Sequence, residues 1–406
     1  MEKIAALHVA WSTNRSHGDA VSEAVEQALE KAEAPVLGLV FSSGDWDRKT
    51  LAHTLAAEFG SIPWGGCTAT AVIADRHIIT EGIAVGVISA PQAFVGVGVA
   101  GPVSQSPLEA GASAVARAID HLPPMPQDGD AAFPRRAVWL LVDSFLGSGS
   151  AVVRGAVREG GVGICWAGGG VGGKGRLSGR MSLLANGRAV LDRAVAVALD
   201  LPSPVGAGMG HGLKPFGPAM SVTKARGEVV EQLDYMPAAE VFERIARREG
   251  GSPDDASASL DDLFHRYPLG IPHADDGYLI CDPFGKTDDD GLTFIAPVYE
   301  GTIVRLMRAS ASEMVAGAAG AVTLARSRLR GRRPGGLLVA DCDGRFLSMG
   351  SAFQDEVDAM ADAAGEGVPM LGCTAYGEIG RLGDGSYPHF HNKTVQILAL
   401  PGEEAS

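Results

Sequence analysis

The chain has 406 residues, of which 46% are hydrophobic and 20% charged, and its net charge is −14. This composition supplies the apolar surface of a globular protein with more than one domain, and it excludes global disorder. The acidic balance argues against nucleic acid and against an anionic membrane surface as partners, because both bind through Lys and Arg.

The cysteines lie far apart in the sequence and form no CxxC pair; they are Cys67, Cys165, Cys281, Cys342 and Cys373. This pattern predicts neither a zinc site nor a disulfide framework. Free thiols are typical of a reducing compartment, so we expect a cytoplasmic protein. The apolar N-terminal segment 4–11 lacks a clear cleavage site, which favours a first β-strand over a signal peptide.

Three segments share one pattern, in which an apolar strand, a small-residue loop and a helix lead into a strand that ends in a Gly/Cys turn. In the first segment the strand is 36–43, the helix 45–59 and the closing stretch 62–71. In the second they are 137–145, 149–159 and 162–173. In the third they are 335–342, 352–364 and 368–379. The repetition predicts an α/β fold with two related domains, built from repeated strand–helix–strand units with mixed sheets. We expect these domains to comprise residues 1–205 and 206–406.

The first and third segments also share the tetrapeptide GCTA, at residues 66–69 and 372–375. In the third segment, apolar residues at helical spacing predict one buried helix face, with Ser351 and Gln354 as a capping box and Gly365 as the stop.

Other elements follow from local signals. The uncharged stretch 82–108 contains three prolines and predicts two strands and a loop, not a membrane span. Asn186-Gly187 predicts a hairpin. Beyond residue 206 we expect a strand pair at 221–233, a helix at 236–247, an exposed loop at 250–259, a hairpin at 278–295, and a helix at 312–330 capped by Ser310 and Glu313.

The run GGGVGGKG at 168–175 resembles a phosphate-binding loop but lacks Ser or Thr after Lys174, and no helix follows it. We therefore do not expect nucleotide hydrolysis. Gly169 and Gly170 could instead line a ligand site, and a purely structural turn is the alternative. Asp143 and Asp341 end predicted strands, where ligands of α/β proteins bind, with helix capping as the alternative.

Polar residues concentrate in the last 70 residues: Cys342, Arg345, Cys373, Tyr376, Glu378, His389, His391, Asn392 and Thr394. Arg345 could clamp a carboxylate, and Glu378 could receive an amino group or pair with Arg345. Cys, His and Asn also resemble a thiol-nucleophile set. His389 and His391 share one face of a strand and could ligate a metal or haem iron, although such a pair is more often structural.

The segments GLLVADCDGRFLSMG, VPMLGCTAYGEIG and HFHNKTVQILAL resemble the C-terminal domain of the FIST family, the F-box and intracellular signal transduction sensory domains. The residues that carry the likeness are Cys342, Arg345, Gly372, Gly377, Glu378, Ile379, His391, Asn392 and Thr394. VFSSGDWD, WGGCTATAVI and AGGGVGG are similar to the N-terminal FIST domain. The segment CDPFGK at 281–286 departs from the pattern, where an arginine is expected.

The resemblance implies a sensory protein that binds a small polar ligand, with amino acids or similar carboxylates as the expected class. It also implies a separate signalling partner, such as a kinase, because FIST domains are often fused to or encoded beside such modules. A haem-binding nitric oxide sensor is one alternative, with His389, His391, Cys342 or Cys373 as axial ligand. A cysteine-dependent enzyme and a ligand-free scaffold are the others.

We hypothesise that Arg345 holds the ligand's acid group, that Glu378 orients a donor, and that the 372–377 turn offers backbone N–H groups. The facing wall and the remaining contacts would come from Gly66, Cys67, Gly169, Gly170, Asp341, Cys342, Gly372, Cys373, Gly377, His391 and Asn392. No catalytic residue is predicted. Ligand identity, signalling partner, oligomeric state, and whether the domains share one site stay open.

Overall fold

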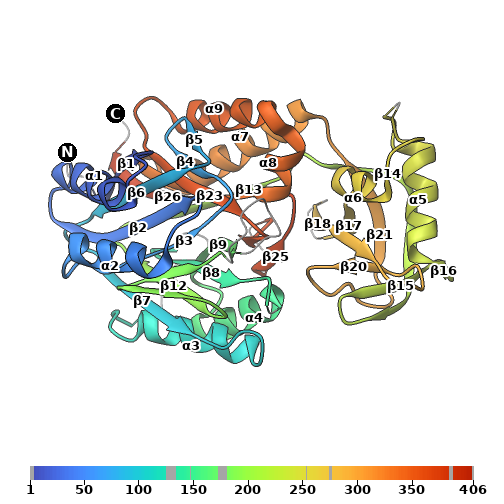
Figure 1. Ribbon diagram of the computed structural model, residues 1–406, viewed down its shortest axis with the longest axis horizontal. Coiled ribbons are helices and arrows are strands. Elements are labelled where there is room, and N and C mark those ends of the chain that lie inside the picture. Colours follow the sequence, from blue (N-terminus) through green and yellow to red (C-terminus); the bar gives the residue numbers. More distant parts are fainter. Residues whose placement is uncertain are drawn as a thin grey trace.

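The structure is a computed structural model that describes residues 4–124, 134–146, 148–171, 181–252, 254–273, 277–383 and 387–404. In these ranges, a large body of three sheets and flanking helices carries a smaller lobe at one side (Figure 1). The glycines and the lysine predicted at 172–175 lie outside the described residues.

The body is built from three repeats of one unit, in which a strand, a helix, a strand, a helix, a strand, a hairpin and a strand follow in order. Repeat 1 comprises β1 (Ala6–Ser12), α1 (His17–Glu30), β2 (Pro35–Ser43), α2 (Arg48–Phe59), β3 (Trp64–Thr68), β4 (Val72–Ala74), β5 (His77–Ile79) and β6 (Gly82–Ser89). Repeat 2 comprises β7 (Phe94–Ala100), α3 (Pro107–Ile119), β8 (Arg136–Asp143), α4 (Gly149–Gly160), β9 (Cys165–Val171), β10 (Leu183–Ala185), β11 (Arg188–Val190) and β12 (Ala194–Asp200).

Repeat 3 has the same order but carries the lobe between its first strand and its first helix. It comprises β13 (Gly206–Gly210), α7 (Ala311–Ser327), β22 (Arg332–Cys342), α9 (Phe353–Ala364), β23 (Met370–Ala375), β24 (Glu378–Gly380), β25 (His389–His391) and β26 (Val395–Glu404). A short helix α8 (Asp343–Met349) and a 3₁₀ turn η1 (Gly350–Ala352) precede α9. The predicted division at 205/206 falls where repeat 3 begins.

Each repeat forms one mixed sheet in the same strand order: β1-β6-β2-β3, β7-β12-β8-β9 and β13-β26-β22-β23. The second and third strands of a repeat pair in parallel, and the other pairs are antiparallel. The hairpin of each repeat extends the sheet of another repeat: β10-β11 joins the first sheet, β24-β25 the second and β4-β5 the third. The three repeats are therefore interlocked in a cycle.

The inner faces of the three sheets meet in one shared core, to which every repeat contributes alternate residues, such as Phe41, Trp139 and Leu338. The outer faces are covered by pairs of helices: α1 and α2 in repeat 1, α3 and α4 in repeat 2, and α7 and α9 in repeat 3. Strands buried on both faces read as continuous apolar runs, which explains how their positions could be predicted.

The third strand of each repeat has a glycine that no other residue could replace. A Cβ at Gly66, Gly168 or Gly372 would overlap the carbonyl oxygen of the residue beside it on the second strand, which is Val40, Leu140 or Val339. This contact explains the glycine of the GCTA tetrapeptide in repeats 1 and 3. It also aligns the tetrapeptide with Gly168–Val171 of repeat 2, where the sequence shows no match.

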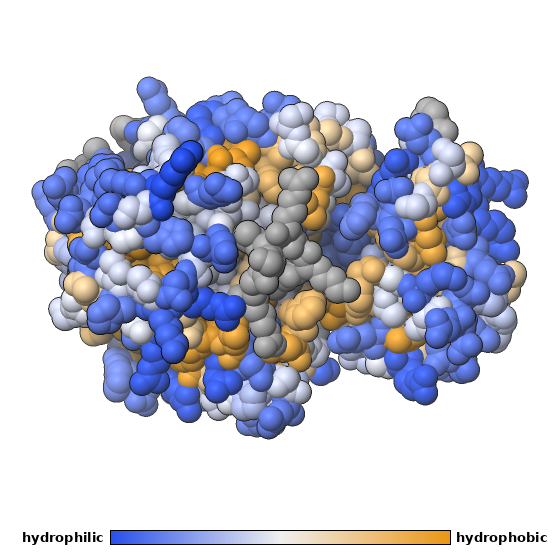
Figure 2. Space-filling view, in the orientation of Figure 1, coloured by the Kyte–Doolittle hydropathy of each residue, from blue (hydrophilic) through white to orange (hydrophobic). Residues whose placement is uncertain are grey.

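The lobe comprises β14 (Lys214–Arg226), β15 (Val229–Leu233), β16 (Met236–Pro237), α5 (Ala238–Glu249), α6 (Leu260–Arg266), β17 (Leu269–Pro272), β18 (Tyr278–Cys281), β19 (Pro283–Lys286), β20 (Leu292–Phe294) and β21 (Ile303–Arg308). Its antiparallel strands pack against α5 and α6 around a core of its own. Between the body and the lobe the surface narrows to a waist (Figure 2).

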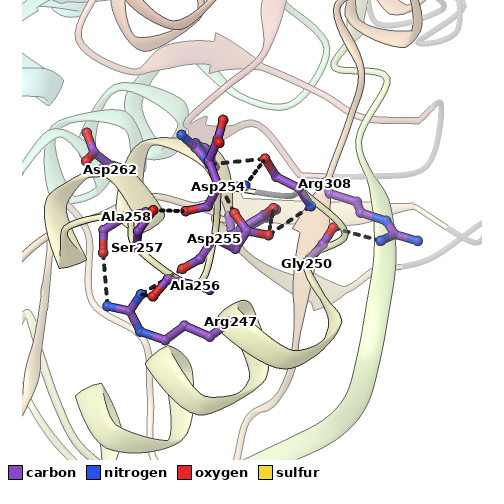
Figure 3. Close-up of polar contacts among 12 residues, drawn as sticks. Arg247, Gly250, Asp254, Asp255, Ala256, Ser257, Ala258, Asp262 and Arg308 are labelled. Atoms are coloured by element: carbon purple, nitrogen blue, oxygen red, sulfur yellow. Dashed lines mark hydrogen bonds and ion pairs between the residues drawn. The ribbon is translucent and has the colours of Figure 1, made fainter.

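The loop between α5 and α6, predicted to be exposed, is tied to the lobe by many polar contacts. Arg247 donates to the carbonyl groups of Asp255, Ala256 and Ala258, and Arg308 donates to that of Gly250 (Figure 3). The side chain of Asp255 is buried, where it accepts a hydrogen bond from the Tyr267 hydroxyl at 2.7 Å.

Several local predictions are confirmed, including the Asn186-Gly187 hairpin, helix α5 and the Ser310–Glu313 capping box of α7. The predicted capping box of α9 is wrong. Ser351 lies in the 3₁₀ turn, and the Gln354 amide donates to the carbonyl oxygen of Arg76. None of the helices in the described part of the chain is long and apolar enough to cross a membrane.

The contact of Gly66 with β2 makes a stability prediction. We expect Gly66→Ala to lower the free energy of unfolding by about 3 kcal/mol or more, because the backbone of β2 cannot move away from the new methyl group. The control is Gly320→Ala in α7, where a Cβ meets no atom within 4 Å, and which should stabilise the protein by up to about 1 kcal/mol. Equal stabilities in urea unfolding would contradict this account.

Candidate functional site

The predicted site residues lie near the carboxyl ends of β22 and β23 and around the turns that follow them. Parallel pairing of β22 with β23 places both carboxyl ends at the same edge of the sheet. Of the predicted residues, this edge brings together Asp341, Cys342, Arg345, Glu378, His391 and Asn392, with Gly377 at the turn between β23 and β24.

Arg345 is the centre of this cluster, and it is fully buried. Its Nε donates to Glu356 Oε1 at 3.0 Å, and one Nη donates to the other oxygen of Glu356. The remaining N–H groups reach three carbonyl oxygens, those of His211 at 2.8 Å, Met314 at 2.9 Å and Lys393 at 3.2 Å. All five donors of the guanidinium are used within the protein, so a ligand carboxylate would have to displace one of these partners.

Glu356, which sequence reasoning missed, is the main acidic partner of Arg345. It lies on the buried face of α9 among Phe353, Val357 and Met360. A charge on an otherwise apolar helix face is the signal that could have revealed it, because such a charge must be paired. Asp341 lies 3.5 Å from the Arg345 Nε, and burial raises its pKa well above the usual range, with a further rise from the nearby Glu356 carboxylate.

Glu378 is a second buried carboxyl group close by. Its Oε2 accepts hydrogen bonds from the Thr394 hydroxyl at 2.8 Å and the Thr394 backbone N–H at 3.1 Å. Its Oε1 has no hydrogen-bond partner among the described residues. Burial raises the pKa of Glu378 to about 8, although the Thr394 contacts oppose the rise. The group is therefore largely protonated at neutral pH.

The segment 391–393 joins the body to the lobe. The Lys393 ammonium donates to the carbonyl oxygens of His265 at 3.0 Å and Gly344 at 3.3 Å, and it lies 3.5 Å from Asp282. The Asn392 side-chain oxygen accepts from the Asp282 backbone N–H at 3.2 Å. Lys393 adopts the left-handed backbone conformation (φ 55°), which is uncommon for a residue other than glycine and marks a tightly held turn.

Asp343 is a further acidic residue of this edge that was not predicted. Only 2% of it is exposed, and neither of its carboxylate oxygens has a hydrogen-bond partner among the described residues. Burial raises its pKa, while the hydroxyl groups of Thr70, Tyr376 and Thr374 lie close enough to oppose the rise without meeting the geometry of a hydrogen bond. These residues come from repeats 1 and 3.

The glycines of repeat 2 adjoin the same place. The backbone N–H of Gly170 donates to the Gly377 carbonyl at 2.7 Å, and that of Tyr376 donates to the Gly170 carbonyl at 2.8 Å. Gly169 pairs with Glu378 in the sheet. Gly377 has a φ of 95°, and a Cβ there would also overlap the Phe390 ring, so only glycine suits this turn.

Family models match most of the chain. The FIST N domain model matches residues 36–236, and the FIST C domain model matches residues 238–381. The chain belongs to the FIST family. FIST domains are sensory domains of signal transduction, and the boundary between the two matched regions falls inside the lobe, at β16.

Solved structures resemble this FIST protein only distantly. Cyanuric acid hydrolase is 11% identical, with 98% of this chain and 99% of that one covered and a TM-score of 0.34. The cyanuric acid hydrolase from A. caulinodans is 10% identical, with 98% and 100% covered and a TM-score of 0.38. T. maritima PurL complexed with ADP is 10% identical, with 98% and 72% covered and a TM-score of 0.24. No curated protein matches the chain.

The cysteines of the FIST motifs have different surroundings. Cys67 and Cys373 point into the shared core, where their sulfur atoms lie 3.8 Å apart, and Gly66 and Gly372 serve the strand packing described above. Cys342 is buried at the end of β22, and burial raises the pKa of its thiol well above its usual value. This environment disfavours the thiolate that a nucleophilic cysteine needs.

Three of the residues considered as haem ligands, His391, Cys342 and Cys373, are enclosed within the protein. His391 is fully buried, its Nε2 lies 3.2 Å from the Gly380 carbonyl oxygen, and burial lowers the pKa of its ring to about 3. The sulfur of Cys342 accepts from the Lys393 backbone N–H, and Cys373 lies inside the core. Within the described ranges, no three His, Cys, Asp or Glu side chains are arranged to hold a metal ion.

Removing the Arg345 charge tests its structural role. We expect Arg345→Met to lower the free energy of unfolding by about 3–5 kcal/mol, because Glu356 and Asp341 would be left buried without their cation. Arg158→Met, on the exposed end of α4, should change it by less than about 0.5 kcal/mol. An Arg345→Met protein of normal stability that has lost ligand binding would instead support the carboxylate-clamp hypothesis.

The raised pKa of Glu378 makes the stability depend on pH. The folded state holds the proton of Glu378 up to about pH 8, whereas the unfolded state releases it near pH 4.5. The contribution of this proton to the free energy of unfolding is therefore fully present below pH 4.5 and is lost as the pH rises toward 8. Glu378 can lower the free energy of unfolding by at most about 1.4 kcal/mol for each pH unit in this range.

Glu378→Gln keeps an acceptor for Thr394 and removes the titration. Urea unfolding of both proteins at pH 5.5 and 8 should therefore show a smaller loss of stability with pH in the variant. Parallel pH profiles would contradict the assignment.

Proposed function

We propose that this FIST protein is a sensory protein that binds a small amino acid or a related amine, with the ligand's ammonium group on Asp343. The supporting observation is the Asp343 carboxylate, which is buried and without a hydrogen-bond partner among the described residues. A buried carboxylate is stable only when a cation or several donors pair with it, and a ligand ammonium supplies three N–H donors.

The surroundings of Asp343 favour an ammonium over an acidic group. Thr70, Thr374 and Tyr376 place hydroxyl oxygens around the carboxylate. These oxygens can accept hydrogen bonds from the ammonium N–H groups of the ligand that do not bond to Asp343. A small ligand is expected, because the surrounding groups come from closely packed strand ends of repeats 1 and 3.

Arg345 acts in this proposal by positioning Asp343 instead of contacting the ligand. It lies in α8, whose first residue is Asp343, and its hydrogen bonds tie that helix to α9, α7 and the turn at Lys393. The wider hypothesis of a ligand carboxylate on Arg345 requires the guanidinium to exchange one of its present partners.

The same contacts offer a path for a signal. Gly344, the neighbour of Asp343, accepts a hydrogen bond from the Lys393 ammonium, which also donates to His265 in the lobe. A ligand that moves the start of α8 would therefore shift the lobe contact. We propose that the lobe presents this change to a separate signalling protein in the cytoplasm, such as a kinase.

The test is a thermal-shift and calorimetric survey of the full chain with the twenty amino acids, ethylamine and acetate. We expect at least one amino-group ligand to raise the Tm and bind, and Asp343→Asn to weaken that binding by at least tenfold, because a charge-assisted hydrogen bond is lost. Asp355→Asn, on the exposed start of α9, is the matched control and should bind normally. Binding of acetate alone, or normal binding by Asp343→Asn, would contradict the proposal.

A further inference from the structure

A groove of about 540 Å³ lies on the seam between repeats 1 and 3, away from the site at Asp343. One wall is β1, the edge strand of the first sheet, and the other is the turn between β4 and β5 together with the segment that enters β23. In Figure 1, β1, β4 and β5 lie at the upper left, and β1 contacts β4. The groove is at the amino end of β23 and Asp343 is at the carboxyl end, about 20 Å away for a six-residue strand.

Repeat 1 differs from the other repeats at this wall. On the outer face of their first strands, repeats 2 and 3 have Gly98 and Gly208, where a Cβ would overlap the carbonyl oxygens of Ala114 in α3 and Ala321 in α7. Those helices therefore lie directly on their strands. Repeat 1 has no glycine on this face of β1, and His8 occupies part of it. His8 lines the groove together with Lys31, which lies at the end of α1.

The groove brings the ammonium group of Lys31 close to the outer edge of β1, the edge strand of the first sheet. Lys31, at the end of α1, donates from its Nζ to the carbonyl oxygen of Val9 at 3.3 Å. That carbonyl points away from β6, and in an antiparallel strand the N–H of the same residue points the same way. One side of the groove therefore offers an ammonium and a backbone N–H close together, which is a suitable pair for a carboxylate.

The rest of the lining limits the ligand class. Val368 and Pro369 are half-buried and provide apolar surface, and the His77 ring lies tilted against Trp11 with ring centroids 4.9 Å apart. The arginine of the lining, Arg76, already pairs with Asp358 and Asp362. Asp75 and Glu366, also in the lining, disfavour a ligand with two negative charges such as a phosphate.

We propose that this seam is a second ligand site, which binds a monocarboxylate with an apolar body. The carboxylate contacts Lys31 and the Val9 backbone N–H, and the apolar body lies over Val368 and Pro369. Because the groove borders β1, the β4-β5 turn and the entry to β23, a ligand there stiffens the contact between repeats 1 and 3.

Calorimetric titration of the full chain with sodium phenylacetate tests the site. We expect saturable binding, weakened at least tenfold by Lys31→Met, which keeps the aliphatic stem and removes the charge. Lys49→Met, at an exposed position in α2, is the matched control and should bind normally. Ala361→Trp should also abolish binding, because the indole fills the groove that Ala361 lines.

Two further measurements separate this site from the one at Asp343. Phenylacetate should shift the backbone amide resonance of Val9, and Asp343→Asn should bind it as the unchanged protein does. The proposal is overturned if phenylacetate does not bind, if Lys31→Met binds it equally well, if Asp343→Asn abolishes binding, or if phenyl phosphate binds more tightly than phenylacetate.

Discussion

The structure depends on one constraint, which is that the inner face of each sheet is covered only by the inner faces of the other two. Every repeat supplies strands to the shared core, and every repeat sends its hairpin to complete a neighbour's sheet. A single repeat would expose both an apolar face and an unpaired strand edge, so the three must fold together. The close contact between the second and third strands, with Gly66, Gly168 and Gly372 at equivalent positions, sets the geometry of each sheet.

Four buried acidic side chains of the body, Asp341, Asp343, Glu356 and Glu378, gather where this arrangement ends. At the carboxyl edge of β22 and β23 the shared core gives way to turns, and there the Arg345–Glu356 pair, Asp341, Glu378 and Asp343 are buried within a short distance of one another. Such a concentration of buried carboxyl groups costs stability through desolvation, and one arginine offsets only part of it. This cost in stability is the physical argument behind the ligand site that we propose at Asp343.

The lobe is connected to the body through the same edge. Lys393 and Asn392 contact His265, Ile280 and Asp282 in the lobe, while the backbone N–H of Lys393 donates to Cys342. Because the two parts share residues of one turn, this turn is the basis of the proposal that the lobe reports on the polar cluster. The groove lies between the same two repeats but at the opposite end of β23, so the two proposed sites act on different contacts between repeats 1 and 3.

The sequence by itself determined the α/β class, the three repeated units, most helix positions and the concentration of polar residues near the C-terminus. These features depend on local apolar periodicity, turn residues and capping, which neighbouring residues encode. FIST motif residues such as Glu378 and His391 were found because they are close in sequence to one another.

Only the tertiary structure decided how the repeats combine and what each polar residue contacts. The exchange of hairpins depends on strand pairing between residues such as Leu183 and Cys67, more than 100 positions apart, which no local pattern specifies. In the same way, Arg345 was predicted as a ligand clamp because its partners Glu356, Met314 and Lys393 lie on other elements. Asp343 was missed because a carboxylate just after a strand appears ordinary until its burial and its lack of a partner are seen. Burial and pairing are properties of the packed chain, and they decide which charged residues are structural and which remain available to a ligand.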